Sequence, residues 1–177
     1  MAEDRQVARC NWFKTLKPVF PVEMIGLWCG SQIAADHPLD GVLENLGWFG
    51  KRFQSDLKAD ALVFQFKPGV LVPLEPAIFP IRLLIRLAPL GQTKVARAVF
   101  PHLQRILLAH DTTAMLTLRM IEGEETTAMV YDKQPIADYF RRIDEKEIAG
   151  MMVIDGDDRR YFFRLRKVDR PTYEISG

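Results

Sequence analysis

Short β-compatible segments follow one another along most of this chain, and turn residues separate them. Each segment is rich in β-branched, aromatic or other apolar residues and is bounded by Gly, Pro, Asn or Asp. They are 24–33, 48–53, 61–66, 70–74, 115–120, 126–131, 136–143, 148–154 and 160–166. Eight or nine strands at such short intervals predict a barrel or a sandwich.

Helical patterns occur at three places between or before these strands. Apolar residues recur about every third position over 7–16, which predicts a short amphipathic helix. The pair His37-Pro38 favours a second helix, because proline suits a first helical turn. Residues 81–87 and 95–108 carry apolar side chains at helical spacing on either side of Pro89, which predicts a pair of amphipathic helices. We therefore expect one mainly β (α+β) domain over 1–177.

Composition excludes several classes of protein. With 48% apolar residues, 27% charged residues and a net charge of +1, the chain is typical of soluble globular proteins, and no nucleic-acid partner is expected. Cys10 and Cys29 are too few for a disulfide framework, so both are expected to be reduced. No apolar run reaches the roughly 18 residues of a membrane span, and the first residues are polar. We therefore expect a cytoplasmic protein.

The common cofactor and catalytic motifs are missing from the sequence. No glycine-rich nucleotide loop and no Gly-x-Ser-x-Gly elbow is present. The histidines, His37, His102 and His110, are scattered, so we expect neither a metal site nor a bound cofactor. Classical hydrolase and metalloenzyme functions are therefore disfavoured.

Three stretches of the sequence carry a family resemblance. Residues 26–30 read Gly-Leu-Trp-Cys-Gly, residues 37–53 follow closely, and residues 129–140 form a further stretch. Together they resemble the GXWXG family and its usual C-terminal companion domain of unknown function. The resemblance implies a GXWXG-like part at 20–75 and a C-terminal β part at 113–168 that completes the barrel. The stretch between them, 76–112, is expected to be a basic helical insert because of its charge and its helical spacing. It supplies no catalytic residues.

A second resemblance is to the calycins, the lipocalin and fatty-acid-binding barrels. In those proteins a Gly-x-Trp on the first strand packs beneath an arginine from the last strand. Here the resemblance implies a structural role for the residues in the motif and at the last strand, with a cation–π contact worth about 0.5–2 kcal/mol. These structural candidates are Gly26, Trp28, Gly30, Arg164 and Arg166.

His37 and Asp40 are the best candidates for acid–base chemistry. Histidine titrates near neutral pH, and a carboxylate three residues further on could orient its ring. The alternative is a helix cap with an aspartate favoured by the helix dipole. Three other aspartates, Asp132, Asp138 and Asp144, are spaced six apart, but Pro135 argues against a shared face.

A barrel of this kind predicts a pocket for a small hydrophobic or amphipathic ligand with an anionic end, such as a fatty acid or lipid-like molecule. Lys51 and Arg52 are consecutive on a predicted strand, so only one of them can face the interior and fix an anionic head group. A solvated position is the alternative for either one. The predicted ligand-binding residues are Trp48, Lys51, Arg52, Phe64, Phe66, Met129, Tyr131, Phe140 and Phe163.

The predicted helical pair lies in a stretch without acidic residues between Glu75 and Asp111. Arg82 and Arg86 lie four apart on its first helix and could contact an anionic membrane surface. Alternatively, the helices pack on the barrel with their arginines in water. Three hypotheses therefore stand: a carrier or sensor, an enzyme that uses His37 and Asp40, and a peripheral membrane or protein-interaction module that uses 81–108. A homodimer is left open.

Overall fold

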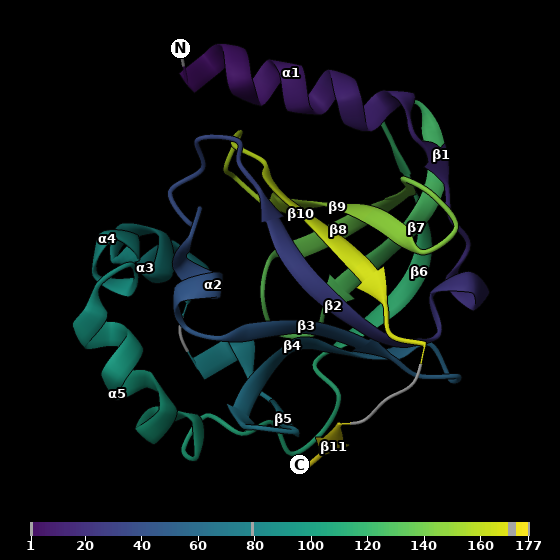
Figure 1. Cartoon of the computed structure of the whole chain (residues 1–177). Helices are drawn as coiled ribbons and strands as arrows, with labels where there is room; N and C mark the ends of the chain where they lie inside the picture. Colours follow the sequence, from purple (N-terminus) through teal and green to yellow (C-terminus); the bar gives the residue numbers. More distant parts are fainter. Residues whose placement is uncertain (1, 79, 170–172, 177) are drawn as a thin grey trace.

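An almost entirely antiparallel sheet, rolled up on itself, forms the centre of the molecule (Figure 1). The computed structural model describes residues 2–78, 80–169 and 173–176. The main strands are β2 (Gly26–Ile33), β3 (Trp48–Phe53), β4 (Lys58–Lys67), β5 (Val70–Pro73), β6 (Ala114–Ile121), β7 (Glu124–Tyr131), β8 (Ile136–Arg142), β9 (Glu147–Ile154) and β10 (Tyr161–Lys167). Two short strands, β1 (Lys17–Pro18) and β11 (Glu174–Ile175), pair with β8 and β5.

Strand β4 closes the sheet into a ring. The sheet order is β11-β5-β4-β3-β2-β10-β9-β8-β7-β6, and β4 also pairs with β6 at the far end. This closing contact joins Lys58 to Met115 and Ala59 to Ala114, whereas the other end of β4 pairs with β5. The predicted mainly β architecture is confirmed, and every predicted strand is present with small shifts of its ends.

Helices cover the barrel at two separate places (Figure 1). Helix α1 (Ala2–Thr15) packs on the outer surface through Phe13, whose ring lies 6.2 Å from that of Phe162. The helical insert, residues 76–112, contains η2 (Pro76–Ile78), α3 (Ile81–Arg86), α4 (Ala88–Gly91) and α5 (Lys94–Gln104). A 3-10 turn, η1 (Pro21–Met24), precedes β2. The predicted pair of helices is therefore present, with α4 between them.

The helix predicted to open at His37-Pro38 begins later than expected. Helix α2 spans only Val42–Asn45, and the residues before it form turns. Gly41 has a φ of 78°, which is left-handed and cannot continue a right-handed helix. Asp40 therefore lies outside the helix, and the predicted favourable effect of the helix dipole on its carboxylate does not apply.

The hydrophobic residues form an inner core and two outer ones. The inner core fills the ring and includes Ile136 and Phe140 of β8. One outer core lies beneath α1 and includes Ala137 and Tyr139 of the same strand. The other outer core lies beneath β11. Because side chains alternate along a strand, β8 sends every second residue into the barrel.

The Gly-Leu-Trp-Cys-Gly motif lies on β2, and its features are structural. A side chain at Gly30 would place its Cβ 2.3 Å from the Trp48 ring, so only glycine leaves room for that ring. The Trp28 indole donates a hydrogen bond of 2.7 Å to the Met24 carbonyl. Trp28 is 3% exposed, as expected for a core residue.

The cation beside Trp28 is not the one that we predicted. Lys167 Nζ lies 5.5 Å from the Trp28 ring, whereas Arg164 and Arg166 both pair with Glu147. Strand register explains the difference, because Lys167 lies directly opposite Trp28. Arg164 and Arg166 belong to the alternate set of side chains, which points out of the barrel.

Candidate functional site

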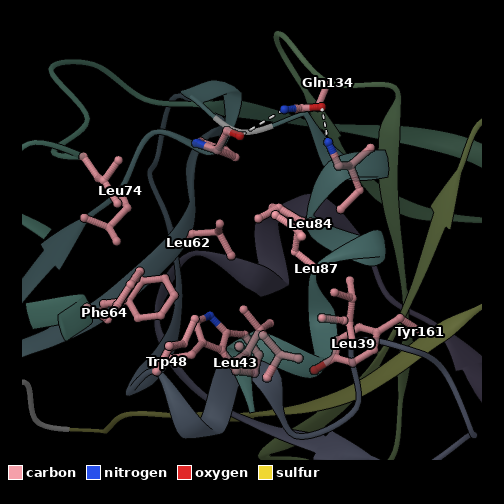
Figure 2. Close-up of a pocket in the computed structure, with 18 of the residues that line it drawn as sticks. Leu39, Leu43, Trp48, Leu62, Phe64, Leu74, Leu84, Leu87, Gln134 and Tyr161 are labelled. Carbon is pink, nitrogen blue, oxygen red and sulfur yellow. Dashed lines mark hydrogen bonds between the residues drawn. The ribbon is translucent and has the colours of Figure 1, made fainter. Parts of the chain in front are cut away.

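A large apolar pocket lies between the barrel and the helical insert (Figure 2). Its volume is about 410 Å³, within the usual range for small-molecule sites. The barrel side of the pocket comes from strands β3, β4, β7, β8, β9 and β10, and from Leu74 just after β5. Its residues include Trp48, Leu62, Phe64, Leu74, Tyr161 and Phe163. The pocket therefore lies at the edge of the inner core.

The opposite side of the pocket is formed by leucines and valine of the helical insert. These side chains are Leu83, Leu84, Leu87, Leu90, Val99 and Leu103. Their exposed fractions lie between 38% and 62%, although they belong to the apolar faces of helices that cover the barrel. Helices α3 to α5 thus enclose a space beside the sheet rather than packing tightly on it.

Side-chain amides hold the helical insert on the barrel. Gln134 donates a hydrogen bond to the Pro76 carbonyl and accepts one from the Ile81 backbone, at 3.0 and 3.4 Å (Figure 2). Asn45 of α2 donates to the carbonyls of Gly91 and Thr93, at 2.8 and 3.0 Å. These contacts hold the start of α3 and the α4–α5 connection on the barrel.

A charged group is buried at the inner end of this apolar pocket. Lys51 is 2% exposed, and its ammonium donates to the Ala61 carbonyl at 2.8 Å. It also forms an ion pair of 2.9 Å with Asp138 and contacts the Tyr131 hydroxyl at 3.3 Å. The Tyr131 hydroxyl in turn donates to Asp138 at 3.4 Å. We call Lys51, Tyr131, Asp138 and the neighbouring Tyr161 the polar cluster.

Aromatic rings surround the Lys51 ammonium. Its nitrogen lies 5.1 Å from the Phe163 ring, 5.7 Å from the Tyr131 ring and 5.9 Å from the Trp48 ring. Such contacts favour a cation that has been removed from water. Strand alternation sends the next residue, Arg52, to the other face, where it pairs with Asp60. The structure thus places Lys51 inside the barrel and Arg52 outside the pocket.

Two oxygens of the polar cluster have no hydrogen-bond partner among the described residues. They are Asp138 Oδ1 and the Tyr161 hydroxyl, and both residues line the pocket. Burial, followed by the Asp138 charge, raises the pKa of Tyr131 well above its usual value. Burial also raises the pKa of Tyr161, helped by Glu44, Asp40 and Asp138. Both tyrosines are therefore neutral near pH 7.

The structure gathers some of the predicted ligand-binding residues and separates others. Those that line the pocket are Trp48, Lys51, Phe64, Tyr131 and Phe163. Met129 and Phe140 are fully buried in the inner core, and the half-buried Phe66 lies beneath Arg105. Sequence reasoning missed Asp138, Tyr161 and the apolar residues of the insert. Asp138 interrupts an apolar strand in step with Ile136 and Phe140, and that signal could have revealed it.

The predicted acid–base pair is not formed. The His37 Nδ1 atom accepts a hydrogen bond from the Leu39 backbone, while the Asp40 carboxylate accepts from the backbones of Ala35 and His37. Asp40 therefore orients the chain and not the imidazole. Burial and the nearby Arg159 lower the pKa of His37 to about 4, so its ring is neutral near pH 7. Neither residue is among those that line the pocket.

Metal-ligand clusters, cysteines and membrane-spanning helices are other features that can indicate function. No group of three or more His, Cys, Asp or Glu side chains there is arranged to hold a metal ion. Cys10 and Cys29 are both free thiols. No helix in the described part of the chain is long and apolar enough to cross a membrane.

Fold and site together define a β-barrel protein with an apolar pocket beneath a helical insert. Residues 11–69 match the family described as GXWXG protein, and residues 112–167 match a domain of unknown function, DUF4334. The two matches, in this order, confirm the sequence resemblance to the GXWXG family with its C-terminal companion domain. Comparison with curated proteins found no match.

One solved structure shares this fold. It is the crystal structure of a protein from Thermomonospora curvata, with a TM-score of 0.66 and 24% sequence identity. The similarity covers 92% of this chain and 87% of that one. At this level of identity, the likeness concerns the fold alone.

Proposed function

We propose that this protein binds a small apolar or amphipathic molecule in the pocket between barrel and insert, as a carrier or sensor. The observation that carries the proposal is the pocket of about 410 Å³, whose helical side consists of partly exposed leucines and valine. Exposed apolar surface is costly in water, at roughly 25 cal/mol per Å². A bound apolar molecule would remove that cost.

The pocket's size limits the ligand. Each water in the liquid occupies about 30 Å³, so a space of this volume suits a molecule on the order of 10–20 non-hydrogen atoms. Its walls are almost wholly apolar, and the polar cluster lies at one end. We therefore propose a ligand with an apolar body and one polar end. The free thiols agree with a reducing compartment, and we propose that the protein works in the cytoplasm.

Native mass spectrometry of protein purified without detergent tests this proposal. We expect a stoichiometric bound molecule that can be extracted and identified, or binding of added medium-chain apolar compounds. Leu62 projects from β4 toward the centre of the pocket (Figure 2), so Leu62→Trp should fill the space and abolish binding. Leu118→Trp, on the exposed side of β6, is the matched control and should bind normally. Equal binding by both variants would contradict the proposal.

A second candidate function is docking to an anionic membrane, from which an apolar ligand could be collected. Basic residues of the helical insert support it, because Arg82 and Arg86 are exposed beside the partly exposed Leu83 and Leu87. The variant with both Arg82→Glu and Arg86→Glu should lose co-sedimentation with anionic vesicles. Unchanged sedimentation would rule this function out.

The enzyme hypothesis finds no support in its predicted residues. His37 and Asp40 do not contact each other through their side chains, and the imidazole is buried. Acid–base catalysis needs a titratable group within hydrogen-bonding reach of the substrate. We therefore favour a binding function for the pocket.

A further inference from the structure

The charge of Lys51 is already balanced within the protein. Its ammonium has three protons, and three oxygens receive it: Ala61 O, Asp138 Oδ2 and the Tyr131 hydroxyl. A ligand carboxylate near this group would also approach Asp138. Two anions would then share one cation in a site with little water, and like charges are strongly disfavoured there. The anionic end that the sequence suggested does not suit this arrangement.

The polar cluster does have capacity for a neutral group. Asp138 Oδ1 belongs to the carboxylate that pairs with Lys51, and a carboxylate oxygen in an ion pair accepts hydrogen bonds. The Tyr161 hydroxyl can donate or accept, and no described residue is its hydrogen-bond partner. Both side chains are at least 98% buried and both line the pocket. Buried polar groups of this kind are normally satisfied.

We propose that the ligand is an apolar alcohol, whose hydroxyl donates a hydrogen bond to Asp138 Oδ1 and pairs with the Tyr161 hydroxyl. This inference rests on the proposed binding function and specifies the chemical class of the ligand. A hydroxyl supplies both the donor that the carboxylate requires and a partner for the tyrosine. An ether lacks the donor, and a carboxylate adds a second negative charge.

Calorimetric titration with three matched probes tests the inference. The probes are 1-decanol, its isomer 1-methoxynonane and the decanoate anion, at pH 7. We expect 1-decanol to bind at least about 10-fold more tightly than either of the others, because a hydrogen bond to a charged group is worth that much or more. Equal or tighter binding of decanoate or the ether would overturn the inference while leaving the proposed function intact. Failure of all three to bind would overturn both.

Two variants make the test specific to the polar cluster. Asp138→Asn leaves the Lys51 charge unbalanced, so the preference should invert and decanoate should bind at least about 10-fold more tightly than it does to the unaltered protein. Asp60→Asn is the matched control, because Asp60 is also buried and paired with a cation of β3, but outside this pocket. It should keep the preference for the alcohol.

Tyr161→Phe covers the case in which Asp138→Asn fails to fold. It leaves the Lys51–Asp138 ion pair intact and removes a hydroxyl that makes no hydrogen bond within the described part of the chain. The affinity for 1-decanol should fall by about 3- to 10-fold, whereas decanoate binding should not fall. An unchanged affinity for 1-decanol would contradict the role of Tyr161.

Discussion

Lys51 and Arg52 are consecutive residues of β3, yet each neutralises a different buried aspartate on a different face of the strand. Lys51 pairs with Asp138 inside the barrel, and Arg52 pairs with Asp60 on the other side. The Lys51 pair is almost fully buried, whereas the Arg52 side chain is 32% exposed. Burying a charge away from water is costly, so Lys51 and Asp138 each need the opposite charge of the other to offset that cost.

Lys51→Met should therefore destabilise the protein by about 3–5 kcal/mol, because it leaves the Asp138 carboxylate buried without a cation. The combined variant Lys51→Met with Asp138→Leu should recover most of that loss, since no unpaired charge remains. Urea unfolding measures the free energy of unfolding of each variant. Arg52→Met is the control, and its free energy of unfolding should fall by less. If Lys51→Met with Asp138→Leu lost as much stability as Lys51→Met alone, the argument would be contradicted.

His37 should make the protein less stable in mild acid. Its pKa of about 4 lies below the usual 6.5, so the unfolded chain binds a proton where the folded one does not. The free energy of unfolding should fall as the pH is lowered from about 6.5 to about 4, by up to about 3 kcal/mol, and the loss is complete below about 4.

His37→Asn isolates this contribution of His37. Asparagine can still accept the hydrogen bond from the Leu39 backbone, but it does not titrate. Unfolding by urea at pH 7, 5 and 4 should show a flatter decline for the variant. Parallel curves for the variant and the unaltered protein would show that His37 does not cause the decline.

At the level of individual residues, sequence alone could predict part of the site. Alternation along a strand required Lys51 and Arg52 to face opposite sides, but it could not tell which one faced inward. The partner of Lys51 is far away in the sequence, on β8, so no local pattern identified it. Pro135 argues against a shared face for Asp132, Asp138 and Asp144, but it precedes β8 and leaves the strand that carries Asp138 regular.

Among the elements, strands were more predictable than helices. The strands could be predicted from their local composition and from the turn residues between them, and β3 has the predicted ends, 48–53. Helix α2 proved shorter than expected because Gly41 has left-handed geometry that a periodic pattern does not reveal. The apolar faces of α3 and α5 were predicted, but the space between them and the barrel depends on tertiary packing.

The helical insert should loosen when its amide contacts are removed. Asn45 donates to two carbonyls at the α4–α5 connection, so Asn45→Ala should increase hydrogen exchange across residues 88–104 while the strands stay protected. Mass spectrometry of exchanged peptides measures this difference. Asn11→Ala, at an exposed position of α1, is the matched control. Uniformly faster exchange in the strands would instead indicate a general loss of stability.

The whole molecule combines a closed ring of strands with an adjacent, incompletely filled space. The ring gives β6 a partner on each side, with β7 along its whole length and β4 at Ala114 and Met115. The helical insert lies beside this ring of strands, and its described residues contribute no strand to it. The barrel can therefore remain folded whether or not the pocket holds a ligand.

Ligand binding should raise the melting temperature of the whole protein. At a ligand concentration 100 times the Kd, binding to the folded state adds about 2.7 kcal/mol of stability. For a domain of this size that corresponds to a rise of roughly 5–10 °C. Differential scanning calorimetry with increasing 1-decanol should show this rise for the unaltered protein and for Leu118→Trp. A similar rise in Leu62→Trp would place binding elsewhere.

The two sides of the pocket come from separate parts of the chain, and this division has an evolutionary consequence. The polar cluster belongs to strands that also hold the barrel together, so changes there cost stability. The leucines opposite it belong to a segment that, over the residues described, contributes no strand to the ring. Mutation can therefore lengthen, shorten or reshape the accepted hydrocarbon while the chemistry of its polar end stays the same.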